Sequence, residues 1–387
     1  MSAAVLLFWF SVAWILYVWI GYPLTLLALS LVRPFRSPSA DAHYPTVSVL
    51  IAARNEQKDI GWKLAQTLAW DYPTGKLEIL VGSDASTDRT DEEIRSVRDP
   101  RIIFMRNPER AGKNVTLNRL ARLSSGEVLF FTDANTHVDP QCLKTMVRHF
   151  ADSRVGCVTG MESNSSSGDM SAMTAGNSAY LEYESALDKL ESRIGSVLVC
   201  DGSIYCLRRD LFNEVDADLA NDLEHPVRVG ASGAAILYEP QARSIERCST
   251  PSEEFARRRR IAAQGALAMW KLRHVLTGLR LWQFVSRKFM RWLTVLPLTL
   301  ALVTNLFLRN EQPYAILLAL QIAFYTVALI GAYRQGNSRL NSTLRIPFVF
   351  LLAHAAVFLG VLDACRRKTF ATWNIPELSR GTSPKQV

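Results

Sequence analysis

The stretch that decides the fold runs from Val47 to Glu56 and reads VSVLIAARNE. Its first seven residues form an almost unbroken apolar run, and its last three are polar. An apolar run without polar alternation is expected of a strand buried on both faces, as in a parallel sheet covered by helices. We therefore predict a buried strand over Val47–Ala53 with a polar loop at its carboxyl end.

Similar apolar runs follow along the chain, separated by amphipathic segments that predict helices. The further strands are expected at Leu77–Val81, Ile102–Met105, Val128–Phe131 and Val155–Thr159. The helices are expected at Gln57–Leu68, Asp88–Val97, Lys113–Leu123 and Pro140–Phe150. This βαβαβ order predicts an α/β fold with a mostly parallel sheet.

Polar, acidic segments follow three of the predicted strands, where sheets of this kind bind their ligands. They are Arg54-Asn55-Glu56, residues 83–88 (SDASTD) and Asp133-Ala134-Asn135. Neither a GxGxxG nor a GxxxxGK[ST] motif follows these strands, so neither a dinucleotide-binding fold nor an ATPase-type phosphate loop is indicated. Phosphate would have to be held in another way.

A divalent cation is one such way, because carboxylates repel phosphate unless a cation lies between them. Oxygen ligands at a strand end favour Mg²⁺ or Mn²⁺. Asp133 and Asn135 suit this site, since alternate residues of an extended strand face the same side. Asp133 has a structural interpretation as well, because it could cap a helix beginning near Asp139.

These segments resemble the family 2 glycosyltransferases, nucleotide-sugar-dependent enzymes with a glycosyltransferase A-type domain, and in particular their membrane-bound, polysaccharide-synthesising branch. The resemblance implies that Glu56 and Asp84 contact the base and ribose of the donor, with Ala53 beside them. It implies that Lys113, in the segment 112–114 (GKN), lies near the donor diphosphate. Asp133 opens the DxD motif, in which an amide replaces the usual second acid, and such a site should hold its metal more weakly.

Two later segments also resemble motifs of this family. Residues 221–223 (NDL) resemble the motif that supplies the general base, which would be Asp222. Residues 257–261 (RRRRI) resemble the QxxRW motif, with Ile261 in place of the Trp that accompanies processive synthesis in many members. Arg257 and Arg260 would neutralise the leaving group, because residues three apart share a helix face. The four arginines could otherwise form a solvated or lipid-facing helix surface.

The resemblance therefore implies a hexosyltransferase that moves a sugar from a nucleotide diphosphate donor, with a UDP-sugar favoured, to a glycan or lipid-linked acceptor. One base without a second catalytic carboxylate implies a single displacement with inversion. The alternatives are transfer of one sugar to a lipid, or a catalytically silent subunit that binds nucleotide sugar. Residues 201–203 (DGS) resemble the segment that lines the acceptor site of this family. Trp270 could stack on the sugar or pack against the membrane-facing helix, and Trp373, Asn374 and Pro376 in the tail could also contact the sugar.

Hydrophobic segments on both sides of this domain predict membrane anchoring. Ala3–Val32 is long and apolar enough to span a bilayer. Arg33 and Arg36 follow it and place the next segment in the cytoplasm. Residues 279–292 have the pattern of a helix lying in the membrane interface. Three more apolar stretches follow, at Leu293–Leu308, Tyr314–Tyr333 and Ile346–Leu362.

The predicted organisation is a multi-pass protein of the cell inner membrane. It has an anchor at 1–33, a cytosolic transferase domain at 45–276, C-terminal membrane helices at 293–363 and a cytosolic tail at 364–387. Three full C-terminal crossings would leave the basic residues 366–368 outside, against the positive-inside rule. One stretch is therefore expected to be shallow or re-entrant.

The charge and the cysteines exclude other classes of protein. The net charge is +8, and the basic residues gather near the membrane-flanking segments. Anionic lipid headgroups explain this distribution better than nucleic acid, for which no motif is present. The six cysteines show no CxxC spacing, so neither a zinc site nor a disulfide framework is indicated.

Overall fold

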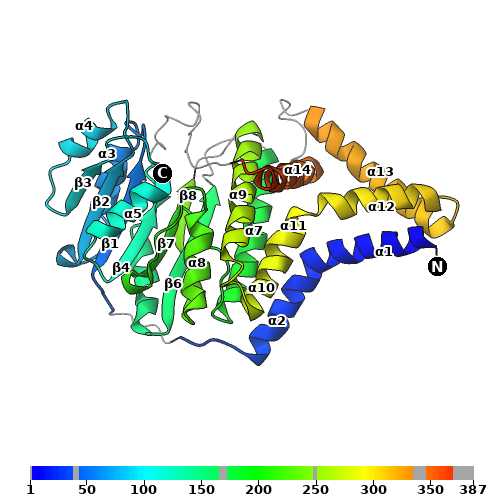
Figure 1. Ribbon diagram of the computed structural model, residues 1–387, viewed down its shortest axis with the longest axis horizontal. Coiled ribbons are helices and arrows are strands. Elements are labelled where there is room, and N and C mark those ends of the chain that lie inside the picture. Colours follow the sequence, from blue (N-terminus) through cyan, green and yellow to red (C-terminus); the bar gives the residue numbers. More distant parts are fainter. Residues whose placement is uncertain (1, 38–42, 165–171, 247–250, 334–345, 369–387) are drawn as a thin grey trace.

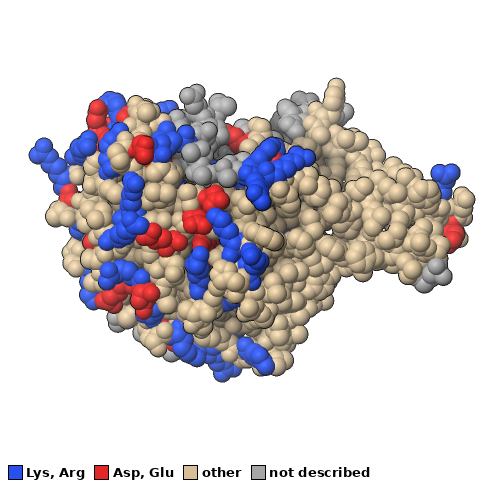
Figure 2. Space-filling view, in the orientation of Figure 1, with Lys and Arg blue, Asp and Glu red and all other residues tan. Residues whose placement is uncertain are grey.

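The computed structural model describes residues 2–37, 43–164, 172–246, 251–333 and 346–368. Figure 1 shows an α/β domain with an arm of long helices projecting from one side. Most of the predicted tail, including Trp373, Asn374 and Pro376, lies outside the described residues. Figure 2 shows that Lys, Arg, Asp and Glu cover the α/β domain, whereas the arm is almost uncharged except at its tip.

One sheet of eight strands within the described residues forms the centre of the α/β domain, in the order β3-β2-β1-β4-β7-β6-β8-β5. The strands are β1 Val47–Ala53, β2 Leu77–Ser83, β3 Ile102–Arg106, β4 Val128–Thr132, β5 His137–Val138, β6 Val155–Asn164, β7 Ile204–Arg208 and β8 Ala235–Glu246. All five predicted strands are present, and β1 has the predicted bounds. The first four strands in spatial order are parallel, as predicted.

The second half of the sheet is mixed. The strand predicted at Val155–Thr159 is β6, but it does not extend the parallel series directly. The antiparallel strand β7 lies between it and β4. β6 then pairs in parallel with β8, and the short β5 pairs antiparallel with β8 at the edge.

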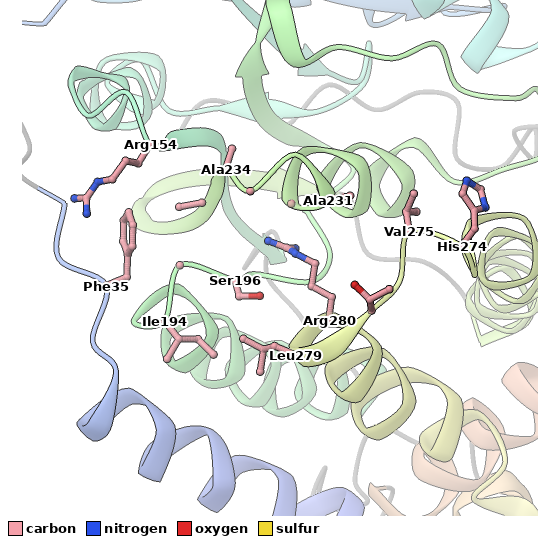
Figure 3. A pocket seen from close by; sticks show the side chains of 15 residues that line it. Phe35, Arg154, Ile194, Ser196, Ala231, Ala234, His274, Val275, Leu279 and Arg280 are labelled. Atoms are coloured by element: carbon pink, nitrogen blue, oxygen red, sulfur yellow. The ribbon is translucent and has the colours of Figure 1, made fainter.

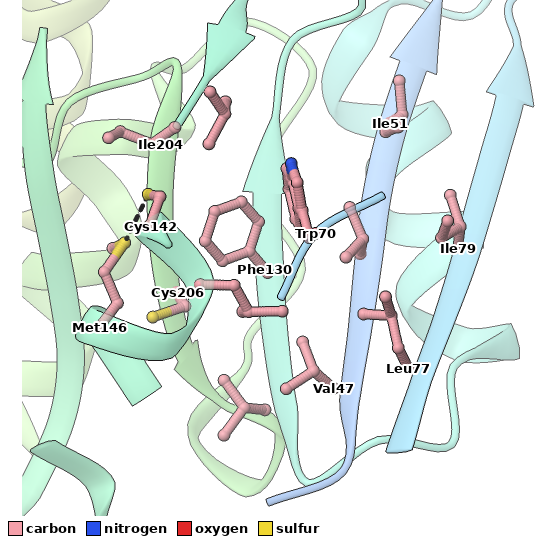
Figure 4. Close-up of a cluster of buried hydrophobic side chains, with 14 of the residues drawn as sticks. Val47, Ile51, Trp70, Leu77, Ile79, Phe130, Cys142, Met146, Ile204 and Cys206 are labelled. Atoms are coloured by element: carbon pink, nitrogen blue, oxygen red, sulfur yellow. Dashed lines mark hydrogen bonds between the residues drawn. The ribbon is translucent and has the colours of Figure 1, made fainter. Parts of the chain in front are cut away.

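Helices cover both faces of the sheet, and alternate residues of β1 pack into two separate cores. Val49 and Ile51 face the side covered by α3 Ile60–Leu68, α4 Thr90–Ser96 and α6 Cys142–Val147. Leu50 and Ala52 face the side covered by α5 Lys113–Leu123 and α8 Asn221–Ala231. Figure 4 shows the first of these cores, where Trp70 and Phe130 lie side by side. This double burial is what the continuous apolar run predicted.

The helical arm begins with α1 Ala3–Leu16, the π-helical turn Tyr17–Gly21 and α2 Tyr22–Val32, which together form a helix of 30 residues. Near the other end of the chain, α13 Gln312–Tyr333 and α14 Ile346–Cys365 are also long and apolar enough to cross a membrane. A fourth candidate is bent by 56° between Gly278–Trp292 and α12 Val295–Leu308. The bend lies at the start of the first of the three C-terminal apolar stretches, and the expectation that one of the three is shallow or re-entrant stays a prediction.

The segment Gly278–Trp292 consists of α10 Gly278–Gln283, the π-helical turn Phe284–Phe289 and α11 Met290–Trp292. It was predicted to lie in the membrane interface, and two of its basic side chains are buried within the protein. Arg287 is only 2% exposed and pairs with Glu191 at 2.6 Å and Asp188 at 2.8 Å. Arg291 is also buried and pairs with Glu184. These acids lie on α7 Ala172–Ser192, so the two arginines fasten the arm to the α/β domain.

The last described helix completes this attachment. α14 packs along α9 Pro251–Leu272, which carries the four arginines of residues 257–260. A Cβ atom placed on Gly360 of α14 would lie 2.2 Å from the carbonyl oxygen of Arg259. Arg259 also donates to Asp363 of α14 at 2.5 and 3.0 Å. Close backbone contact and an ion pair therefore hold these two helices together.

Candidate active site

The loops after β1 and β2 are bonded to each other at the carboxyl edge of the sheet. Arg54 donates from Nη1 to the carbonyl oxygen of Asp84 at 2.7 Å. Asn55 accepts at Oδ1 from the backbone N–H of Thr87 at 2.8 Å. Asn55 and Ala85 both adopt positive φ angles, of 54° and 49°. These tight turns bring the polar residues after the two strands into one surface.

The predicted nucleotide-contact residues lie in these loops. Ala53 ends β1, and its carbonyl oxygen accepts from the backbone N–H of Asp84 at 2.9 Å. Glu56 is only 3% exposed, and its backbone N–H donates to Oγ1 of Thr90 at 2.8 Å. The structure thus brings Ala53, Glu56 and Asp84 together, while their contact with a nucleotide stays a prediction.

Asp84 is completely buried, and its carboxylate binds the backbone at the start of α5. Its Oδ1 accepts from Asn107 at 3.0 Å and from the backbone N–H of Ala111 at 2.7 Å. Its Oδ2 accepts from the backbone N–H of Gly112 at 3.0 Å. A carboxylate in this position is favourable at the amino-terminal end of α5. Asp84 therefore fixes the place where α5 begins, and hence the position of Lys113.

Lys113 and Asp133 form the centre of the candidate site. Lys113 is the first residue of α5, and its Nζ lies 2.5 Å from Oδ1 of Asp133. Asp133 follows the last residue of β4 and is partly buried, whereas Asn135, two residues later, is exposed. The Asp133 carboxylate is thus already paired with a cation.

The oxygen atoms near Asp133 limit what a metal could bind there. No described group of three or more His, Cys, Asp or Glu side chains is arranged to hold a metal ion. Asp133 and Asn135 offer one carboxylate and one amide oxygen. Mg²⁺ commonly uses one or two carboxylates together with the phosphates of a ligand. The two residues fit a cation that shares its ligands with a bound diphosphate.

Lys63 forms hydrogen bonds to both ends of the loop that contains Asp133. Its role was not predicted from the sequence. Its side chain is completely buried on α3. Nζ donates to Oγ1 of Thr132 at 2.9 Å and to the carbonyl oxygen of Thr136 at 2.8 Å, on either side of Asp133. Burial lowers the pKa of Lys63 to about 7, and Asp133 opposes this effect. The available signal was its place on the buried stripe of α3 with Ile60 and Leu64.

Asp222, which its motif predicts to be the general base, lies in the first turn of α8. Burial raises the pKa of its carboxyl group, while the positive charges of Lys113 and Lys288 lower it. Asp133 adds a smaller upward effect, so the two acids and Lys113 share one electrostatic environment. A Cβ atom on Gly202 would lie 3.3 Å from Oδ2 of Asp222. The absence of a side chain at Gly202 leaves the carboxylate accessible from that side.

The arginines of residues 257–260 have different partners. Arg260 makes no hydrogen bond or ion pair within the described ranges, although Asp133 and Asp222 both raise its pKa. Burial, the largest effect, lowers that pKa. Arg257 instead lies 2.9 Å from Glu254 and 4.0 Å from Glu162. Of the two arginines predicted to neutralise the leaving group, Arg260 is thus the one whose pKa Asp133 and Asp222 influence. The roles of both arginines stay predictions.

A second acidic group lies beside the site. Burial raises the pKa of Glu162 to about 7, with Arg257 opposing and Asp201 adding to this increase. Asp201 accepts from the backbone N–H of Ser203 at 2.9 Å, within the segment expected near the acceptor. Trp270, the other expected acceptor residue, is 67% exposed and lies against Arg273.

The chain is similar to known glycosyltransferases. Residues 48–215 match the sequence family described as Glycosyl transferase family 2. A β-monoglucosyldiacylglycerol synthase of Synechocystis sp. is 30% identical over 163 residues, which cover 39% of this chain and 34% of the relative. An N-acetylglucosaminyltransferase of Rhizobium meliloti is 27% identical over 234 residues, 54% of each chain. The chain thus matches about a third to a half of the length of these relatives.

A solved structure shares the fold over almost the whole chain. It is the mannosyltransferase PcManGT from Pyrobaculum calidifontis in complex with GDP-Man and Mn²⁺. The TM-score is 0.72 at 21% sequence identity, and the match covers 94% of this chain and 99% of that one. The glycosyltransferase A-type fold predicted from the sequence is therefore confirmed. Residues 48–215 of this chain thus form a domain that matches glycosyl transferase family 2.

Proposed function

We propose that this chain transfers a hexose-type sugar from a nucleotide diphosphate donor to a hydroxyl group of a lipid-linked or glycan acceptor, with inversion at the anomeric carbon. The observation that carries the proposal is the shared environment of Lys113, Asp133, Asp222 and Arg260 at one edge of the sheet. It combines a candidate base with cationic groups for a leaving diphosphate. The resemblance described above favours a UDP-sugar, and the neighbour solved with GDP-Man makes a GDP-sugar the alternative.

In the proposed reaction, the acceptor oxygen forms a bond to the anomeric carbon as the bond from that carbon to the diphosphate oxygen breaks. Asp222 takes the proton of the attacking hydroxyl group. Its raised pKa suits a general base, because a more basic carboxylate removes protons more effectively near neutral pH. Lys113 and Arg260 stabilise the negative charge that develops on the departing nucleotide diphosphate.

Asp133 and Asn135 would hold Mg²⁺ or Mn²⁺ together with oxygen atoms of the diphosphate. The Lys113 ammonium group already pairs with Asp133, so a bound cation would share or replace this contact. When bound, the cation supplies additional charge neutralisation for the leaving group. Transfer should stop in excess chelator and return with added Mn²⁺. Full activity in chelator would contradict the proposed metal site.

The donor is best identified by measuring the thermal stability of the purified full chain with a panel of nucleotide sugars. The stabilising donor is then incubated, in labelled form, with a membrane lipid extract. Asp222→Asn should abolish transfer and keep the stabilisation by donor. Unchanged turnover in this variant would remove Asp222 from its role, and donor binding without transfer by the wild type would favour the silent-subunit alternative.

Transfer of a single sugar to a lipid is the second candidate, and Ile261 favours it over polymerisation. The same labelled incubation separates the two: a single lipid-extractable product supports single transfer, and a ladder of products supports polymer synthesis. The helices of the arm support a place in the cell inner membrane. Arg33 and Arg36 support a cytoplasmic transferase domain.

A further inference from the structure

A cavity lies at the end of the sheet opposite the candidate active site. Its volume is about 650 Å³, and its lining includes the starts of two strands, Arg154 before β6 and Ala235 at β8. These two strands run parallel to each other and antiparallel to β7, which is itself antiparallel to β4. Their starts are therefore at the end of the sheet away from Asp133, which follows the carboxyl end of β4.

Four further segments close the cavity, as Figure 3 shows. The segment after α2 contributes Phe35, and the loop after α7 contributes Ile194 and Ser196. The last turn of α8 and the start of α10 lie on opposite sides. The cavity is thus bounded by the points where the chain leaves one membrane-length helix and enters the bent segment that leads to another.

Arg280 extends from α10 into the middle of this cavity (Figure 3). Its guanidinium group lies across Gly230, where an added Cβ atom would be 1.7 Å from Cζ. Nη1 is buried and has no hydrogen-bond partner. Within the described part of the chain, no carboxylate forms an ion pair with Arg280. A desolvated guanidinium without an anion is unfavourable, so the site is built for a negatively charged ligand.

The other charged groups around the cavity do not supply that anion. Arg154 at the rim is paired with Asp152 at 2.7 Å and lies over the ring of Phe35. Glu191 is the acid that acts electrostatically on Arg280, but its Oε2 is bonded to Arg287 at 2.6 Å. His274 adds a further basic side chain at the rim. The cavity therefore keeps an excess of positive charge.

Apolar side chains accompany this charge. Phe35, Ile194, Val275 and Leu279 line the cavity, and Leu279 is 40% exposed. A cationic centre beside an apolar rim suits a molecule with a phosphate group and a hydrophobic part. Arginine is well adapted to such phosphates, because its planar fork can donate two hydrogen bonds at once.

We propose that this cavity is a phosphate-binding site centred on Arg280, and that its place between the ends of α2 and α10 favours the phosphodiester of an anionic lipid headgroup over soluble phosphate. The site is separate from the proposed sugar-transfer centre. α8 connects the two, since Asp222 lies in its first turn and Gly230 in its last, about 12 Å apart along the helix.

The test uses the purified full chain in detergent and in phosphate-free buffer. Thermal unfolding is followed while dioctanoyl phosphatidylglycerol, dioctanoyl phosphatidylcholine or inorganic phosphate is added. The lipid with the anionic headgroup should stabilise the wild type, and the zwitterionic lipid should not. Stabilisation by inorganic phosphate alone, if lost in Arg280→Gln, would support the site and identify soluble phosphate as its ligand.

Two variants and one control test whether binding of the lipid depends on Arg280. Arg280→Gln should weaken binding of the phosphatidylglycerol by about tenfold to a hundredfold, the usual effect of losing a charged hydrogen-bond donor. Gly230→Ala should do the same, because the added methyl group displaces the flexible guanidinium while alanine suits the helix. Arg273→Gln removes an equal charge at an exposed position nearby and should bind as the wild type does.

Three results would overturn the proposal. They are no stabilisation by either phosphate source, equal stabilisation by the two lipids, or an unchanged response in Arg280→Gln. The Gly230→Ala variant tests whether misfolding could explain a loss of lipid binding. It should unfold at the wild-type temperature or above when no ligand is present, because it replaces a helical glycine.

Discussion

Replacing the buried Lys63 with methionine should separate the stability of this protein from its activity. The pKa of Lys63 falls from its usual 10.5 to about 7, which corresponds to an unfavourable burial free energy of about 5 kcal/mol. Against this, methionine would remove the hydrogen bonds to Thr132 and Thr136 and leave a buried carbonyl oxygen unpaired, at a cost of about 3 kcal/mol. The variant should therefore be more stable than the wild type near pH 7, by about 2 kcal/mol.

The difference in unfolding free energy between Lys63→Met and the wild type should decrease as the pH rises. Between pH 7 and pH 10.5, Lys63 is protonated in the unfolded chain and mostly neutral in the folded one. The wild type therefore gains stability as pH rises through this window, by up to about 1.4 kcal/mol per pH unit. The methionine of the variant does not titrate, so the advantage of the variant should shrink with rising pH and reverse toward the upper end.

The assay is unfolding of the two purified proteins in detergent across this pH range, together with the rate of sugar transfer. We expect Lys63→Met to transfer sugar more slowly, because the loop that presents Asp133 loses its support on both sides. Lys189→Met, at an exposed position, is the matched control and should change neither property. A stability difference that is constant with pH, or full activity in Lys63→Met, would refute the reasoning.

Three other changes test the site. Because burial raises the pKa of Asp222, the transfer rate should fall with decreasing pH at values above the ordinary aspartate pKa of 3.8, and the pH–rate profile measures this. Gly202→Val should crowd the same carboxylate and lower kcat with little change in donor KM; the reverse pattern would contradict its proposed place. Arg260→Gln should raise the donor Kd about tenfold or more, whereas Arg258→Gln, whose arginine pairs with Glu254, should leave it nearly unchanged.

The first half of the sheet could be predicted because its signals are local. Each of β1 to β4 is a short apolar run followed by a polar turn, and β1 has the predicted bounds. The insertion of β7 between β4 and β6 has no such signal. Ile204–Arg208 pairs with residues about 50 to 80 positions earlier, and a run of five residues does not reveal its neighbours. Such pairing is decided by the packing of the whole domain.

The candidate site could likewise be predicted only in part from the sequence. Lys113, Asp133 and Asp222 could be found because they lie in recognisable segments. The roles of the arginines could not, since they depend on helix phase and on distant partners. Arg259 is bonded to Asp363, which lies 104 residues later in the chain. Lys63 escaped notice because a lysine in an amphipathic helix is usually a surface residue.

The contact between α9 and α14 has a consequence for the environment in which the protein works. Helices of fixed length tilt to match the thickness of the bilayer around them. Because Gly360 brings α14 against the backbone of α9, a change of tilt must move the helix that carries Arg260 or break the bond between Arg259 and Asp363. The rate of transfer should accordingly pass through an optimum as the acyl chains of the surrounding phospholipid are lengthened.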